Sequence, residues 1–124
     1  MRIEYDIKLG FKDVMFRPKR STLKSRSLVS LERTFKFMHT GQTWTGIPVM
    51  AANVDTVGTF EMAVALQKYQ LFTAIHKHYT VKQWNDFLVN APEGIENYLA
   101  VSTGTLEKDT EKVDEIFKEN PNLK

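Results

Sequence analysis

The 124-residue sequence contains no cysteine, so this stretch holds no disulfide, no cysteine metal site and no thiol nucleophile. It also lacks an apolar run near the ~20 residues that a membrane-spanning helix needs. Residues 1–10 carry four charged side chains and no apolar core, which excludes a secretory signal there. No Walker loop, GxGxxG or GxSxG motif occurs. Together with 42% hydrophobic and 26% charged residues, these absences predict a cytoplasmic globular protein without a membrane segment.

Charge is distributed unevenly along the chain. Residues 1–26 hold eight basic and three acidic side chains, a balance of +5, whereas residues 105–124 hold six acids and four lysines, a balance of −2. Such a basic segment suits a phosphate-bearing ligand, and it equally suits a solvated surface. It lacks the interleaved aromatic residues on which nucleic-acid bases stack, so no nucleic-acid partner is predicted.

The first 45 residues are expected to form an extended, irregular extension that ends in a hairpin. Residues 34–38 alternate as a strand does, residues 39–42 contain turn-forming types, and residues 43–45 fit the returning arm. We therefore divide a single incomplete domain, 1–124, into an extension with hairpin (1–45) and a second part (46–124).

The second part alternates between apolar strands and amphipathic helices. Residues 47–52 form a continuous apolar run, as expected of a strand that is buried on both faces. Thr59 is positioned to cap a helix, and Thr80 with Gln83 fits a capping box. Three strand–helix pairs are predicted. Strand 47–52 precedes helix 59–69, and strand 71–75 precedes a helix that starts after Thr80 and turns Val81, Trp84 and Leu88 inward. Strand 98–101 precedes a helix marked by Val113, Ile116 and Phe117.

This β-α-β-α-β-α order predicts an α/β fold with a parallel sheet. Two continuations fit the pattern, an open doubly wound sheet and a closed (β/α)₈ barrel. Neither is complete in 124 residues, because a barrel typically needs ~250.

In both architectures the loops that follow the strands build the active site. Three polar loops are predicted at the carboxyl ends of the strands. Their polar residues are Asn53 and Asp55 in the first loop, His76, Lys77 and His78 in the second, and Ser102, Thr103 and Gly104 in the third. Asn53 and Asp55 suit a ligand hydroxyl or amide, and equally suit local turn chemistry. Lys77 suits a phosphate, carbonyl or carboxamide, and equally suits solvent. The two histidines lack a third ligand at metal-binding spacing, so no metal is predicted.

Six segments closely resemble GMP reductases in order and spacing: residues 9–14, 17–26, 31–35, 51–60, 73–79 and 101–104. The resemblance implies a (β/α)₈ TIM barrel of which this chain forms about three β/α units. It also implies an oxidoreductase of purine nucleotide metabolism that uses NADPH to deaminate GMP reductively to IMP and ammonia. Members are usually homotetramers. The related IMP dehydrogenases usually carry a domain inserted after the second barrel helix, and the short connection here has no such insertion.

The resemblance also implies roles for individual residues. Ser25 and Arg26 match a pair that reaches the NADPH of a neighbouring subunit, and Lys77 matches a lysine that contacts the cofactor near the chemistry. The segment Asn53-Val54-Asp55 matches the loop that lines the purine nucleotide pocket. Family members usually have methionine at the position of Val54, and valine makes a shorter and less polarizable contact with a purine.

The catalytic residues implied by the family lie outside the sequence. The family nucleophile is a cysteine, which would follow Lys124, so we assign no catalytic residue within residues 1–124. An alternative hypothesis is a truncated, non-catalytic paralogue that binds nucleotide or docks onto full-length subunits. Three β/α units would leave unpaired strand edges, which predicts marginal stability or self-association for the chain by itself.

Overall fold

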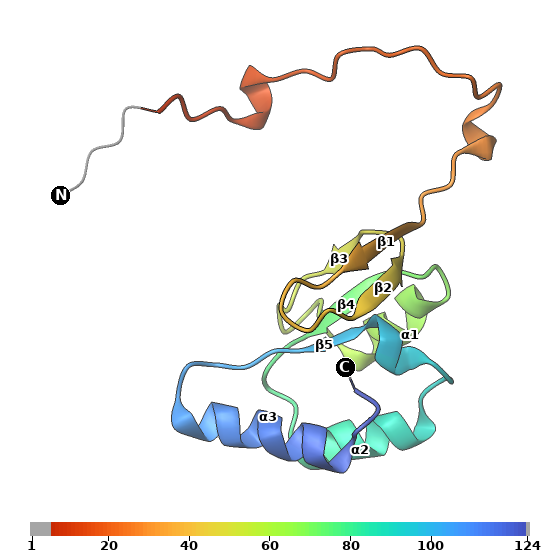
Figure 1. Cartoon of the computed structure of the whole chain (residues 1–124). Helices are drawn as coiled ribbons and strands as arrows, with labels where there is room; N and C mark the ends of the chain where they lie inside the picture. The colour runs from red at the N-terminus through yellow and green to blue at the C-terminus, as the bar shows by residue number, and fades with distance from the viewer. Residues whose placement is uncertain (1–5, 124) are drawn as a thin grey trace. The chain divides into compact units, whose positions relative to one another are not determined.

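The computed structural model describes residues 6–123, which belong to two compact units, Met1–Ser30 and Leu31–Lys124 (Figure 1). In the first unit, residues 6–30 form two single 3₁₀ turns, η1 (Phe11–Asp13) and η2 (Arg26–Leu28), joined by extended chain. The backbone N–H of Gly10 donates to the carboxylate of Asp13 at 2.9 Å, which closes η1. All described residues of this unit are exposed. Over residues 6–30 the chain is extended and irregular, while the extension of residues 1–45 expected from the sequence stays a prediction.

The second unit begins with an antiparallel hairpin. Strand β1 (Arg33–Lys36) pairs with β2 (Thr43–Gly46), and the hydroxyls of Thr34 and Thr45 meet across the pair at 2.8 Å. The predicted strand 34–38 ends two residues earlier, because residues 37–42 form the turn: the N–H of Phe37 donates to Gln42 O, and that of Gly41 to Phe37 O. Gly41 has a φ of +69°, a conformation that glycine adopts without steric cost.

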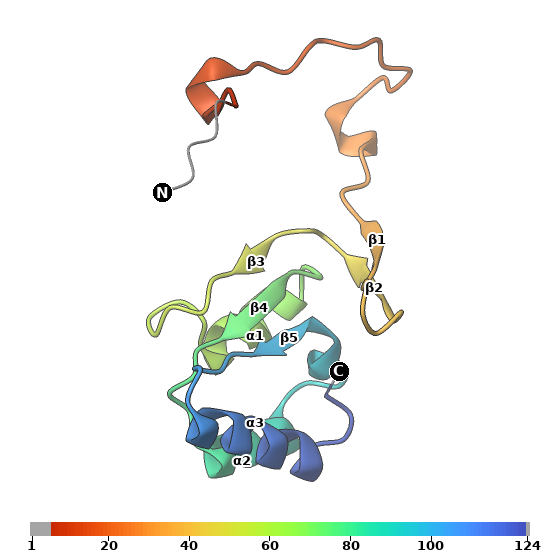
Figure 2. The same cartoon turned by 60° about the vertical axis from the view of Figure 1, so that its left-hand side comes forward.

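A three-stranded parallel sheet follows in the order β3-β4-β5, with a helix after each strand (Figure 2). Met50 is paired with Phe72, and Thr73 with Leu99. The predicted order β-α-β-α-β-α is therefore confirmed. Its elements are β3 (Met50–Ala51), α1 (Phe60–Gln67), β4 (Phe72–Ile75), α2 (Val81–Asn90), β5 (Leu99–Val101) and α3 (Glu107–Glu119), with a 3₁₀ turn, η3 (Ile95–Tyr98), before β5.

Local capping chemistry sets two of the three helix starts. The hydroxyl of Thr59 accepts from the backbone N–H of Met62, and that of Thr80 from the N–H of Gln83, whose side chain accepts from Thr80 N–H in return. Both caps agree with the sequence-based prediction. The third helix begins after Leu106 without a side-chain cap, and it ends at Glu119, two residues before Pro121.

One face of the sheet packs against the helices. Thr73, Ile75 and Leu99 point to this face and are buried with Trp84 of α2 and Ile116 of α3. Figure 2 shows α2 and α3 side by side. Burying the apolar side chains of Ile75, Leu99, Trp84 and Ile116 supplies the principal stabilisation of the unit.

The opposite face of the sheet is not covered by helices, which corrects one prediction. Only Met50 and Ala51 of the apolar run 47–52 form a strand, and Met50 is 59% exposed rather than buried on both faces. Among the strands of the described chain, β3 lies at the sheet edge and pairs with β4 alone. Pro48 also has no N–H to donate to a neighbouring strand.

Over residues 6–123 the observed class is mixed α/β, with a short parallel sheet and three helices. The hairpin belongs to the same compact unit as this sheet. Within residues 6–123, no helix combines the length and apolar composition needed to cross a bilayer. A closed barrel is an extension of this topology that stays a prediction.

Candidate functional site at the carboxyl edge of the sheet

The three polar loops follow the carboxyl ends of neighbouring parallel strands. In Figure 2 the chains that leave β4 and β5 run side by side at the left of the sheet. The first loop is joined to β4 at Gly58, whose carbonyl accepts from the N–H of His76 at 2.9 Å. A β-carbon at residue 58 would lie 2.2 Å from Ala74 O, so only glycine permits this approach.

The first loop presents three predicted nucleotide-rim residues to solvent. Asn53, Val54 and Asp55 are all exposed, while a tight turn formed by bonds from the N–H groups of Val57 and Gly58 to Val54 O shapes the backbone beneath them. Among residues 6–123, the side chains of Asn53 and Asp55 have no hydrogen-bond partner. Local turn chemistry therefore does not occupy these groups, and their amide and carboxylate are available to a ligand.

The second loop is held by stacked rings. The imidazole of His76 stacks on Tyr79 with centroids 4.2 Å apart, and Tyr79 stacks on Phe60 of α1 at 3.8 Å. The Nδ1 of His76 accepts the N–H of His78 at 3.2 Å, which places the proton of a neutral His76 ring on Nε2. His76 is thus a buried structural member of the loop, while Lys77 and His78 remain exposed.

The third loop lies beside Lys77. A β-carbon at Gly104 would lie 3.5 Å from the Nζ of Lys77 and 2.0 Å from Oδ2 of Asp109. The lysine of the second loop and the first turn of α3 therefore meet at Gly104. Glycine leaves the space that both charged groups occupy, so the second and third loops form one continuous polar edge.

The start of α3 is not an anion site. A helix N-terminus attracts negative ligands through its unpaired N–H groups. Here the first turn already carries Glu107 and Asp109, whose charges complement those N–H groups and repel a phosphate. The hydroxyl of Thr103 donates to Gly104 O at 3.2 Å. The third loop is therefore best described as a strand-to-helix turn that packs against Lys77.

The structure places the other two predicted cofactor residues in the first unit. Ser25 caps η2, where its hydroxyl accepts from the N–H of Ser27 at 3.3 Å, and Arg26 begins that turn with an exposed guanidinium. Asn53, Val54, Asp55 and Lys77 share the sheet edge of the second unit. The six predicted residues thus form two groups, Ser25 and Arg26 in the first unit and the other four in the second.

Two residues near the edge carry little signal in the sequence. Lys112 and Asp109 of α3 contact the second and third loops, and their only sequence signal is a spacing of three along a charged helix. Charged residues on helices are mostly solvated, so that spacing does not single them out. Across residues 6–123, no cluster of three histidine, aspartate or glutamate side chains is arranged to hold a metal ion.

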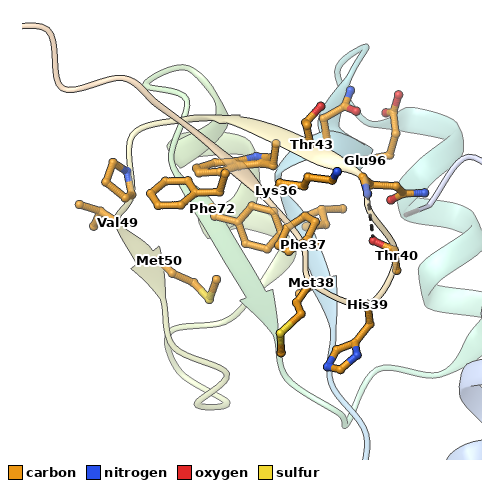
Figure 3. Close-up of a pocket in the computed structure, with 17 residues that line it drawn as sticks. Lys36, Phe37, Met38, His39, Thr40, Thr43, Val49, Met50, Phe72 and Glu96 are labelled. Carbon is orange, nitrogen blue, oxygen red and sulfur yellow. Dashed lines mark hydrogen bonds between the residues drawn. The ribbon is translucent and has the colours of Figure 1, made fainter.

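A cavity lies elsewhere in the second unit. It encloses about 790 Å³ between the hairpin and the open face of the sheet, near the amino ends of the parallel strands (Figure 3). Its walls include Phe37 and Met38 from the hairpin turn, and Met50 and Phe72 from the sheet. None of the predicted site residues lines it. The cavity and the polar loops therefore occupy opposite ends of the sheet.

Comparison with known proteins gives a consistent match. The chain is 59% identical to a GMP reductase of Citrobacter koseri and 59% identical to one of Salmonella newport, in each case over 123 residues. It is 58% identical to a GMP reductase of Enterobacter sp. strain 638. Each match covers 99% of this chain and 35% of the relative. The chain therefore spans about a third of the length of these relatives. No family model matches it.

Fold and site together define an α/β protein whose polar groups gather where parallel strands end. Within that class, the sequence match identifies the particular family. The chain belongs to the GMP reductases and corresponds to the N-terminal portion of its members, which confirms the resemblance read from the sequence.

Proposed function

We propose that this chain supplies the cofactor-side and nucleotide-rim residues of a GMP reductase that converts GMP and NADPH to IMP, ammonia and NADP⁺. One observation carries the proposal: 59% identity extends over 99% of the chain, including all three polar loops. The complete enzyme would be an oxidoreductase with a (β/α)₈ barrel, of which residues 46–124 form the first three units. The homotetramer and the cytoplasmic location expected from the sequence belong to the same proposal.

The residues present fit a phosphate-bearing nicotinamide cofactor. Arg26 offers an exposed guanidinium, which forms bidentate hydrogen bonds with phosphate, and Ser25 offers a hydroxyl beside it. Lys77 offers an exposed ammonium at the sheet edge, suited to a carboxamide or phosphate oxygen. In this assignment Ser25 and Arg26 reach the cofactor of a neighbouring subunit, while Lys77 serves its own site. The cofactor supplies the hydride for the reduction.

The nucleotide rim is assigned to the first loop. The unpaired amide of Asn53 and carboxylate of Asp55 are suited to the hydroxyl and N–H groups of a purine nucleotide. Val54 is 51% exposed between them and offers an apolar contact to the base. The groups that attack the purine and handle ammonia are assigned to the part of the family sequence that these 124 residues do not cover.

The first test measures NADPH oxidation by the complete protein with GMP as the only nucleotide. We expect oxidation that yields IMP and ammonia in equal amounts, because reductive deamination releases one of each. Xanthosine monophosphate is the matched control and should give no oxidation. Oxidation with xanthosine monophosphate and none with GMP would overturn the proposal. Background rates with both nucleotides would instead favour the non-catalytic paralogue.

The second test concerns Lys77. Replacing it with alanine in the complete enzyme should lower kcat/KM for NADPH by about tenfold or more, because a charge-assisted hydrogen bond is lost. Binding of GMP should change much less. Lys82→Ala is the matched control, since Lys82 is an exposed lysine on the neighbouring helix α2. Unchanged NADPH kinetics in the Lys77 variant would remove this residue from the cofactor site.

A further inference from the structure

The side chain of Lys112 reaches from α3 to the backbone of the second loop. Its ammonium donates to the carbonyl oxygen of Lys77 and, at 3.1 Å, to that of Tyr79. Lys112 is partly buried, and its donors are directed at two carbonyls of one loop rather than at an acidic side chain. A lysine used in this way holds backbone in place, and the backbone that it holds carries Lys77.

The rest of the loop is ordered from within. The His76–Tyr79 stack and the bond from His78 N–H to His76 Nδ1 fix both sides of Lys77. These contacts leave the carbonyls of Lys77 and Tyr79 for Lys112. Hydrogen bonds from a charged donor are shorter and about twice as strong as neutral ones. Lys112 therefore completes the restraint on a loop whose exposed members include Lys77.

Asp109 strengthens this arrangement from the same helix face. Residues three apart on a helix are neighbours, so Asp109 and Lys112 point in a similar direction from α3. The carboxylate of Asp109 and the Nζ of Lys77 both border Gly104, 2.0 and 3.5 Å from the position that a β-carbon would take there. One face of α3 thus provides a cation to the backbone of Lys77 and an anion near its ammonium.

We infer that Lys112 is a positioning residue that holds the 76–79 loop and thereby orients Lys77 toward the cofactor. The role of Lys77 in this inference rests on the proposed function. The restraint of the loop by Lys112 rests on the structure alone. Lys112 contacts neither cofactor nor nucleotide in this assignment. Its effect is transmitted through two backbone carbonyls.

The direct test measures amide hydrogen exchange at His78 in the complete protein. Lys112→Met removes the donors while keeping a long unbranched side chain, so the loop should open more often and the His78 amide should exchange about tenfold faster or more. Lys118→Met is the matched control, because Lys118 is an exposed lysine on the same helix, and it should leave this exchange unchanged. Lys112→Arg keeps a charged donor and should restore slow exchange.

Equal exchange in the Lys112→Met and Lys118→Met proteins would overturn the inference. If Lys112→Met does not fold, the same comparison is made with Lys112→Gln, which keeps one neutral donor on a shorter stem and should also accelerate exchange. Equal exchange in that protein and the control would have the same meaning.

Kinetics of the complete enzyme then test the functional half. Lys112→Met should raise KM for NADPH several-fold and leave KM for GMP near its original value, because the loop carries a cofactor residue. A merely structural role would change both constants or neither. Faster exchange without any NADPH oxidation by the unmodified protein would support the restraint and reject the proposed function, so the two failures are distinguishable.

Discussion

Apolar side chains are placed in opposite ways in the two compact units. Phe11, Met15 and Phe16 of the first unit are 96% to 102% exposed, whereas Ile75 and Trp84 of the second are at most 1% exposed. The second unit repeats its apolar residues at strand and helix spacing, so each element has one apolar face that a neighbour covers. The first unit has no such spacing. The difference shows that an apolar residue is buried by a matching second surface rather than by its own hydrophobicity.

The largest change in unfolding free energy is expected at the centre of the sheet face that the helices cover. Replacing Trp84 with alanine removes a 1% exposed indole that packs edge-on against Phe60 at 5.1 Å. Such deletions cost about 3–5 kcal/mol of unfolding free energy, a large share of the stability of a small domain. Urea unfolding of the 124-residue chain and its variant measures this change. A loss below about 1 kcal/mol would show that the helix-covered face is not the stabilising core.

A smaller change, an increase in unfolding free energy, is expected at Thr73, which is on the same face of the sheet. Its hydroxyl is buried and has no hydrogen-bond partner among the described residues. Thr73→Val keeps the branched shape and removes this desolvated group, so unfolding free energy should rise by about 1 kcal/mol. Thr34→Val on the hairpin is the matched control: its hydroxyl bonds to Thr45, so stability should fall slightly. A decrease in both variants would contradict the account of Thr73.

The smallest effect is expected in the first unit. Phe16→Ser replaces a fully exposed ring, so the unfolding free energy of the dilute chain should change by no more than about 0.5 kcal/mol. The same urea experiment measures it beside Trp84→Ala. A loss comparable to that of Trp84→Ala would mean that Phe16 is buried in solution, and the contrast between the two units would no longer hold.

Features that depend on neighbouring residues were predicted well from sequence. The caps at Thr59 and Thr80 were found because a side-chain oxygen satisfies an N–H only three residues away. The start of α3 had no such signal, because Leu106 has no capping group.

Features that depend on distant contacts were predicted less well. The apolar run 47–52 has the same sequence pattern whether helices cover one face of the sheet or both, and in the structure they cover only one. Burial of Met50 depends on elements outside its own segment, which periodicity does not report.

In the candidate site, too, the features set by local sequence were predicted and those set by distant contacts were not. Asn53, Asp55 and Lys77 were placed at one edge because parallel strands end on the same side of a sheet. Lys112 was missed because its contact joins residues 33 and 35 positions apart in the chain. The cofactor roles of Ser25 and Arg26, and the division of the chain at residue 45, stay predictions.

The hydrogen bond between Gly58 and His76 has a thermodynamic consequence. It ties the loop of Asn53 to the loop of Lys77, so a displacement of one loop strains its hydrogen bond to the other. Coupling between two binding sites is reciprocal: the factor by which a first ligand changes the affinity for a second equals the factor by which the second changes that for the first. This backbone bond, at a glycine position that leaves no room for a side chain, is therefore a physical route by which a displacement of one loop is passed to the other.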